Sequence, residues 1–217
     1  NMLQRIRELA VQGSNGTLGE SDRLIVAQEV NSLRDAIFSL ANTEDESGNL
    51  IFSGTAVEAP AFSKDADGLI AYEDDLNQTS VDISEYRQVS INRPGDAVFS
   101  SVSRTNDDGD QEMVSFFTVI SDFINALESG SESDLSQGLT EVSVLADEMA
   151  LSLADVGSRM NTVDSQRDIL ADAKLRYQDL LSNAEDLDYA TAVTKLSAQV
   201  LSLEAAQASF AKISQLN

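Results

Sequence analysis

The chain has 217 residues, and its 37 Asp and Glu against 14 Lys and Arg give a formal net charge of −23. Such an acidic chain is repelled by phosphate backbones, which argues against binding to nucleic acid. It contains neither Cys nor His. This excludes disulfides, thiol chemistry, Ser-His-Asp triads and the ordinary ligands of zinc, haem and copper.

The sequence shows no run of about 18 apolar residues, so it predicts no membrane-spanning helix and no membrane partner. No cleaved signal peptide is recognisable either. The lack of Cys fits the cytosol, and fits equally an extracellular protein that is stabilised without disulfides. Because the chain opens at Asn1-Met2 inside an amphipathic pattern, we expect an upstream segment to be missing.

Residues 1–43 carry the pattern of two helices. Apolar residues step by four and three from Met2 to Leu9, which predicts a short amphipathic helix. After the breaking stretch "QGSNGT", Thr17 and Glu20 match the S/T-x-x-E capping pattern, with Ser21-Asp22 as competing starts. The apolar residues that follow again alternate steps of four and three: Val26, Val30, Leu33, Ile37 and Leu40. This heptad spacing predicts a second helix to about residue 43.

The stretch "GNLIFSGT", residues 48–55, marks the exit from the helical part. Gly48 is expected to stop the helix, and Gly54 to turn the chain outward. The apolar triplet Leu50, Ile51 and Phe52 is too short for a helix face, so we expect it to close the end of the helical rod as a first strand. The sequence therefore predicts a structural boundary here, between a rod and an inserted module.

Residues 50–102 have the alternation of short strands. "AFSKDADGLIAY" predicts two strands joined by a turn at Asp67-Gly68. "SVDIS" and "YRQVSIN" alternate as well, and Pro94-Gly95 predicts a turn before a last apolar pair, Val98-Phe99. "SRTNDDGDQ" is then expected to be a polar connector. Four or five short strands would make a small antiparallel β module.

Residues 112–128 predict a core helix, because a broad apolar stripe with three-four spacing is typical of one. The stripe consists of Met113, Phe116, Ile120, Phe123 and Leu127, with Phe117 and Ile124 beside it. "SGSESD" then predicts a linker, with Ser133 or Asp134 as the N-cap of the next helix.

From residue 142 to residue 184 the four-three spacing continues for six heptads. The positions are Val142, Ala146, Met149, Leu153, Val156, Met160, Val163, Arg167, Leu170, Lys174, Tyr177, Leu181 and Ala184. About fifty helical residues would extend roughly 75 Å, so the pattern predicts one strand of a coiled coil. The three preceding helices, folded back antiparallel, could cover most of residues 134–184.

At "NAEDLDYA" the pattern slips by one residue, which predicts a bend or break near residues 185–188 and a separate C-terminal helix. The seam resumes at Tyr189, Val193, Leu196, Val200, Leu203, Gln207 and Phe210, with Ile213 and Leu216 after it. No other segment of the sequence remains to cover this C-terminal seam. A long exposed apolar stripe indicates association with an upstream segment of the same protein, with other copies, or with both, or else a tail that is disordered in isolation.

Together these patterns predict an α+β protein: an elongated antiparallel α-helical coiled-coil rod with a small inserted antiparallel β domain. The expected parts are the N-terminal rod (1–47), the β domain (48–105), the C-terminal rod (106–184) and a terminal helix (185–217).

A calcium loop is the sharpest chemical hypothesis in the sequence. "SKDADGLIAYED", residues 63–74, matches an EF-hand loop in part, but it begins with Ser63, ends with Asp74 and lacks flanking helices. A hairpin turn accounts for it better. The sequence contains no catalytic constellation, so we expect no enzyme, no catalytic or cofactor-binding residues, no metal site and no cofactor.

Four passages of the sequence resemble a known family. They are "NMLQRIRELAVQGSNGTLGESDR" (1–23), "ANTEDESGNLIFSGTAVEAPAF" (41–62), "INRPGDAVF" (91–99) and "LDYATAVTKLSAQVLSLEAAQASFAKISQLN" (187–217). They are similar to passages of the flagellin superfamily. Within it they resemble the hook-associated protein 3 family, the hook–filament junction proteins of bacterial flagella. The first passage is shared with flagellin, and the second and the last favour the junction protein. The first helices of that family are missing before Asn1.

The resemblance implies a structural subunit that is exported through the flagellar type III apparatus to the extracellular flagellum. Its partners would be flagellin, another hook-associated protein and copies of itself in a ring, with an export chaperone before assembly. Two alternatives stay open: a flagellin that forms the filament itself, and a secreted acidic coiled-coil binding protein.

Overall fold

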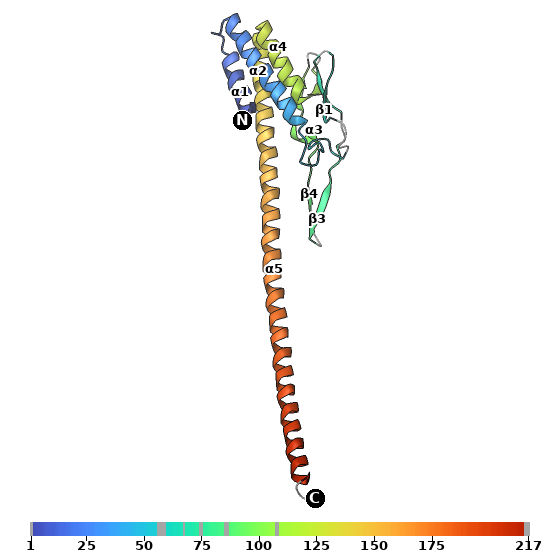
Figure 1. The fold of residues 1–217 in the computed structure, drawn as a ribbon. Helices are drawn as coiled ribbons and strands as arrows, with labels where there is room; N and C mark the ends of the chain where they lie inside the picture. Colours follow the sequence, from blue (N-terminus) through green and yellow to red (C-terminus); the bar gives the residue numbers. More distant parts are fainter. Residues whose placement is uncertain are drawn as a thin grey trace. The chain divides into compact units, whose positions relative to one another are not determined.

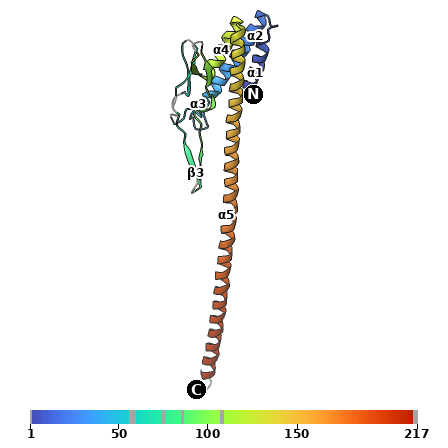
Figure 2. The ribbon, with the colours of Figure 1, turned by 180° about the vertical axis from the view of Figure 1, so that it is seen from behind.

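The computed structural model describes residues 2–55, 60–66, 68–73, 76–84, 87–106 and 109–214, apart from the side chains of 186–188. Asn1–Met160 form one compact unit, and Asn161–Asn217 form a second one. Figures 1 and 2 show the helices and hairpins of the first unit and the single helix of the second. The predicted α+β class is confirmed, since helices dominate and the strands are short and antiparallel.

The helical part of the first unit is built around α4. It consists of α1 (Met2–Gly13), α2 (Glu20–Ala41), α4 (Phe116–Ser129) and the beginning of α5 (Glu132–Ser214). α4 has eight buried residues because its apolar positions cover a wide stripe. Its ends are well defined: the Ser115 hydroxyl accepts a hydrogen bond from the Thr118 amide, and Gly130 ends the helix at φ 72°. This left-handed conformation is the usual glycine stop.

The start of α2 differs from the expectation. The N-cap is Gly19, without a side-chain bond, so the predicted Thr17–Glu20 capping box is wrong. Thr17 is engaged one turn earlier, where both its amide and its hydroxyl donate to the Asn15 side-chain oxygen. The local Asn15 turn therefore satisfies Thr17 before the helix can use it.

Six strands form three separate two-stranded antiparallel hairpins in the part of the chain that the structure describes. The pairs are β1 (Phe62–Lys64) with β2 (Ile70–Tyr72), β3 (Ser80–Ser84) with β4 (Arg87–Ser90), and β5 (Val102–Thr105) with β6 (Gln111–Val114). The first two hairpins confirm the strands expected at 62–72 and 80–90. Asp67, half of the expected turn, lies outside the described residues.

The third hairpin corrects the sequence interpretation. β5–β6 replaces the polar connector, and the boundary expected between residues 105 and 106 falls inside this hairpin. Met113, expected in the core helix, lies on β6 with 68% of its surface exposed. The short helix α3 (Gly95–Val98) occupies the place where Pro94-Gly95 was expected to turn the chain before the last apolar pair.

Three loops share one hairpin chemistry: Asp45–Asn49, Asp65–Leu69 and Asn106–Asp110. In each, the side-chain oxygen of the first residue accepts the amide of the fifth, at 2.8–2.9 Å. The fourth residue is a glycine at φ 82–86°, a conformation that favours glycine. The stop expected at Gly48 is therefore wrong: α2 ends at Ala41, and Gly48 turns a loop closed by the Glu44–Leu50 bridge.

α5 is covered over a much shorter length than expected. Leu135, Val142 and Leu145 are buried, and Met149 is partly buried, but Leu151 and later apolar residues are largely exposed. The expected cover of most of residues 134–184 is therefore wrong. The physical reason is pairing: α1 has only 12 residues, and α2 packs mainly on α4.

The second unit consists of α5 alone, from residue 161 to Ser214. The helix continues through residues 185–188, so the predicted break is wrong. A slip of one residue rotates an apolar stripe by about 100° on a continuous helix, and it requires no break.

Candidate assembly surface

The predicted boundary residues lie where the hairpins meet the helices. Phe52 is half-buried, and its ring packs edge-to-face on Phe99 with centroids 5.5 Å apart. The Phe52 carbonyl accepts the Gly95 amide at 2.8 Å and the Tyr72 hydroxyl at 3.3 Å. The stretch 50–52 is a bridge followed by turns rather than the expected first strand.

The other boundary residues have different surroundings. Leu50 is half-buried, whereas Ile51 has 45% of its surface exposed. Gly54 has φ 65°, and its carbonyl accepts Asn92 Nδ2 at 2.6 Å. This bond ties Gly54 to the segment that follows β4.

An aromatic cluster fastens this boundary to the helices. Its members are Phe38, Phe52, Phe62, Tyr72, Phe99, Phe116 and Phe117, which are linked by ring contacts with centroids 5.1–6.3 Å apart. They come from α2, the boundary, the first hairpin, the end of α3 and α4. Aromatic pairs add to the free energy of area burial, by about 0.5–1.5 kcal/mol each.

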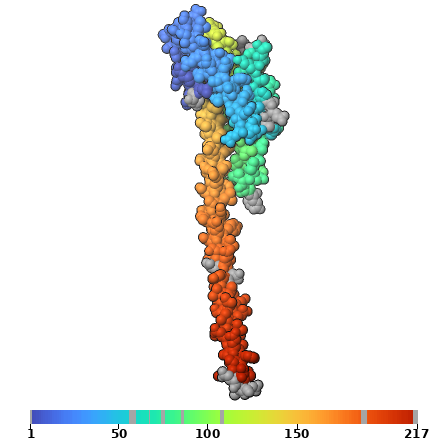
Figure 3. Space-filling view, viewed as in Figure 1, coloured from blue at the N-terminus to red at the C-terminus, as the bar shows by residue number. Residues whose placement is uncertain are grey.

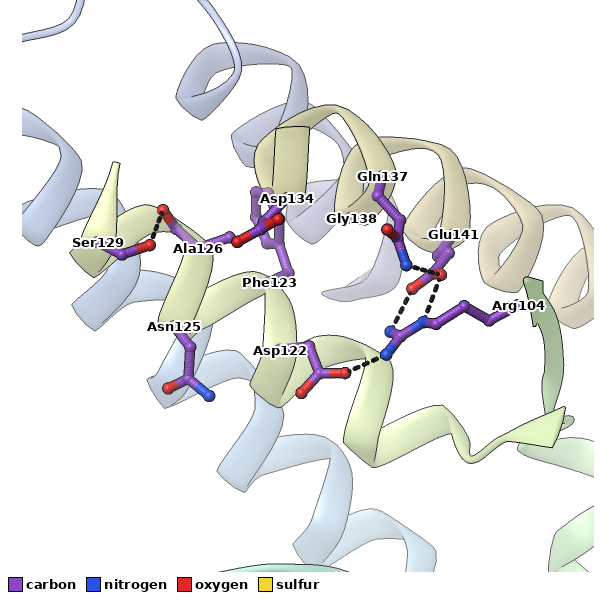
Figure 4. A pocket seen from close by; sticks show the side chains of 10 residues that line it. All are labelled: Arg104, Asp122, Phe123, Asn125, Ala126, Ser129, Asp134, Gln137, Gly138 and Glu141. Atoms are coloured by element: carbon purple, nitrogen blue, oxygen red, sulfur yellow. Dashed lines mark hydrogen bonds and ion pairs between the residues drawn. The ribbon is translucent and has the colours of Figure 1, made fainter. Parts of the chain in front are cut away.

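A cavity of about 410 Å³ lies between α4 and the first turns of α5. Figure 4 shows Arg104 reaching into it from β5. Its guanidinium donates to both oxygens of Glu141, at 2.8 and 2.7 Å, and to Asp122 Oδ2 at 2.7 Å. Gln137 Nε2 donates to Glu141 as well, at 3.0 Å.

The charged side chains of this cavity shift one another's pKa values. The hydrogen bonds that Arg104 donates to Glu141 raise the pKa of Arg104, although partial burial lowers it. Burial tends to raise the pKa of Glu141, but the bonds from Arg104 and Gln137 together hold it below its usual range. Arg104 of the third hairpin is paired with Glu141 and Asp122, so these ion pairs fix that hairpin to α4 and α5.

No group of three or more Asp or Glu that could hold a metal was found among the described residues. In the loop that partly matches an EF-hand, Ser63 donates to Glu73 at 2.8 Å, and the Asp65 carboxylate accepts the Leu69 amide. Asp67 and Asp74 of that loop lie outside the described residues. None of the helices described is long and apolar enough to cross a membrane.

The predicted C-terminal seam lies open on α5. Exposed fractions are 74% for Tyr189, 44% for Val193, 61% for Leu196, 47% for Val200, 59% for Leu203, 76% for Phe210 and 66% for Ile213. Figure 3 shows the surface of this part of α5 in orange to red. The three-four spacing puts these side chains on one face of the helix. Leu216 lies outside the described residues.

Charge distinguishes the two units. Residues 1–160 carry 29 Asp and Glu against 9 Lys and Arg, a net charge of −20, whereas residues 161–217 carry 8 against 5, a net charge of −3. Residues 189–217 contain only Lys195, Glu204 and Lys212. The open seam is therefore apolar and almost uncharged, which lowers the repulsion between two such helices.

Sequence reasoning missed Arg104 and Glu141, which join elements far apart in the chain. Arg104 stands in a polar stretch that is typical of a connector. Glu141 offered one weak indication, because it interrupts a helix face beside the apolar Val142. Its burial, with 6% of the residue exposed, depends on a partner that only the fold supplies.

Comparisons with known proteins agree with the family resemblance. Residues 1–57 match the family described as the N-terminal helical region of bacterial flagellin. Flagellar hook-associated protein 3 of Escherichia coli is 27% identical over 228 aligned residues, which cover 99% of this chain and 71% of that protein. Flagellin C of Vibrio anguillarum is 37% identical over 67 residues, only 18% of its own length.

A solved structure shows the same fold. The crystal structure of hook-associated protein 3 from Legionella pneumophila superposes with a TM-score of 0.73 and 17% sequence identity. The alignment covers 86% of this chain and 88% of that one. The hook-associated likeness therefore extends along nearly the whole chain, whereas the flagellin likeness covers a part of it.

Proposed function

Since the chain is homologous to flagellar hook-associated protein 3 along nearly its whole length, we propose that it is a structural subunit of the hook–filament junction of a bacterial flagellum. The observation that carries the proposal is the likeness along 99% of this chain, which covers 71% of the relative, whereas the likeness to a flagellin covers 31% of this chain.

In the proposed role, the open seam of α5 is the assembly surface. An apolar stripe whose residues are 44–76% exposed is costly in water, and packing against a neighbouring helix would remove that cost. Another helix can pack on such a heptad seam through knobs-into-holes contacts. The near-neutral charge of residues 189–217 favours such packing between copies.

The proposed partners are flagellin on one side, another hook-associated protein on the other, and copies of the chain itself in a ring. The protein would reach the extracellular flagellum through the type III export apparatus, with an export chaperone before assembly. We infer a non-enzymatic role, because the charged cavity between α4 and α5 is occupied by its own ion pairs.

The alternative is a flagellin that forms the filament itself, since residues 1–57 match the flagellin N-terminal region. Incubating the intact protein alone distinguishes the two functions: a flagellin grows long filaments, whereas a junction subunit does not.

Binding to its neighbours is measured next, with purified flagellin and with the other hook-associated protein in separate experiments. Junction function predicts binding to both partners and no long filaments from the protein alone. If the protein bound neither flagellin nor the other hook-associated protein, the proposal would be contradicted.

A further inference from the structure

The β3–β4 hairpin is held to the first unit differently from the other two hairpins. The first and third hairpins each bury apolar residues in the core: Phe62 and Ile70, and Val102 and Val114. None of the described residues of β3 and β4 is buried. We call residues 79–84 and 87–92 the arm. Because the arm contributes no residue to the core, its position depends mainly on polar contacts.

The base of the arm is tied by Asn92. Its Nδ2 donates to the Gly54 carbonyl at 2.6 Å, and its Oδ1 accepts the Thr79 amide, also at 2.6 Å. The Ile91 amide donates to the Thr79 carbonyl at 2.9 Å and closes the two strands. These bonds fix the base without fixing the direction of the strands beyond it.

Two arginines hold the arm to α5. Arg93 Nη1 donates to Asp155 Oδ2 at 3.0 Å and lies 3.5 Å from the Ser152 carbonyl. Arg159 Nη1 reaches the Ser90 carbonyl of β4 at 3.4 Å, and its Nη2 lies 2.8 Å from the same Asp155 oxygen. Asp155 thus accepts both guanidinium groups, one from beside the arm and one from its own helix.

Gly157 lies between the two α5 members of this set. A Cβ at this position would meet nothing within 4 Å, so packing gives no reason for a glycine here. Glycine weakens a helix interior because it loses more backbone freedom on folding. The Asp155–Arg159 pair, four residues apart, spans this weak point and supports the helix across it.

We propose that Arg93, Asp155 and Arg159 form a salt-sensitive clamp that couples docking of the arm on α5 to helical order around Gly157. When the clamp opens, the described residues of the arm keep the bonds at its base, and a two-stranded hairpin alone is marginally stable. The helix loses its support across Gly157 at the same time. Because such coupling is reciprocal, firmer helical order at this position strengthens docking of the arm.

Docking is measured with two spin labels on the intact chain, which has no native Cys to remove. The labels are attached through Gln88→Cys on β4 and Glu148→Cys on α5, both at exposed positions. The native clamp gives one narrow distance distribution at low salt. Asp155→Asn, or molar salt in the native chain, adds a broad component at longer distances, because screening weakens exposed ion pairs.

The matched control is Asp147→Asn. Asp147 also lies on α5 and pairs with an arginine, Arg7, at 3.3 Å, but that arginine belongs to α1. This variant leaves the arm distances as they are in the native chain. An unchanged distribution in Asp155→Asn, or an equal change in Asp147→Asn, overturns the clamp.

Coupling is measured with Gly157→Ala in the native chain and in the Asp155→Asn variant. In the native chain, Gly157→Ala raises the salt concentration at which half of the arm is released; in the Asp155→Asn variant it leaves the arm released. Asp155→Asn also speeds amide hydrogen exchange in residues 152–160, by about fivefold. If Gly157→Ala has no effect on the arm, or the same effect in both backgrounds, or if exchange in 152–160 is unchanged, the coupling is wrong.

Discussion

Phe123 and Phe210 both lie on the apolar stripe of a helix with three-four spacing, yet their exposure to solvent is opposite. Phe123, on α4, exposes no surface, whereas Phe210, on α5, exposes 76%. Seven of the eight Phe lie in the first unit and support its core. The second unit has the same kind of stripe, and its apolar residues are exposed. Periodicity therefore identifies an apolar face, and only the fold decides whether that face is a core or a contact surface.

The largest difference is expected from the two phenylalanines themselves. Phe123→Ala should lower the free energy of unfolding by about 3–5 kcal/mol, because it leaves a cavity in the core. Phe210→Ala should change it by less than about 0.5 kcal/mol, as exposed substitutions do. Hydrogen exchange of α4 in the monomer measures both values. Equal losses would contradict the division into a core and an open surface.

Ion pairs give the next comparison. The Glu141 side chain is 8% exposed and is held by Arg104, whereas Asp164 and Arg167 are 67% and 78% exposed and 3.8 Å apart. Glu141→Ala should destabilise the first unit by about 3 kcal/mol, because it leaves a largely buried guanidinium short of a partner. Asp164→Ala should cost less than about 0.5 kcal/mol. Chemical denaturation followed by circular dichroism measures the loss of stability in both variants. A comparable loss in both would refute the structural role of the Arg104–Glu141 ion pair.

Two glycines of α5 should respond with opposite signs. A Cβ on Gly138 would lie 2.6 Å from Phe123 Cδ2, so Gly138→Ala should destabilise by about 1–3 kcal/mol through overpacking. At Gly157 the space is open, and Gly157→Ala should stabilise the helix by up to about 1 kcal/mol. Thermal unfolding of the two variants compares a covered turn with an open one. A stabilising Gly138→Ala would show that α4 does not press on α5 there.

The smallest effect is expected with pH. The pKa of Glu141 is held below its ordinary value of 4.5, so the unfolded chain takes up this proton first as the pH falls. The stability supplied by Glu141 is therefore complete above pH 4.5 and is lost as the pH falls through its folded pKa. The stability difference between the native chain and Glu141→Gln should be constant at neutral pH and should shrink in acid. A stability difference that grows in acid would contradict the stated direction of the Glu141 pKa shift.

The sequence predicted α1, α2, α4 and the beginning of α5, two of the three hairpins and the open seam, because each depends on a local period. It could not predict the β5–β6 hairpin, because Arg104 stands in a polar stretch that is typical of a connector. The partner of Arg104, Glu141, is distant in the chain, and only the fold brings the two together. It also predicted too much cover for α5, because spacing does not say that α2 pairs with α4. The slip near residue 185 was taken for a break, although a continuous helix accommodates it by rotation of the stripe.

The central claim is that the open seam of α5 is an assembly surface, and one pair of substitutions tests it most directly. Leu196→Asp places a charge in the seam, and Ala198→Asp places the same charge two residues away on the opposite side of the helix. Each is introduced into the protein in the bacterium that encodes it, and its amount in purified flagella is measured by immunoblot. We expect Leu196→Asp to be absent from flagella and Ala198→Asp to be incorporated normally. Normal incorporation of Leu196→Asp, or an equal loss of both variants, would contradict the account.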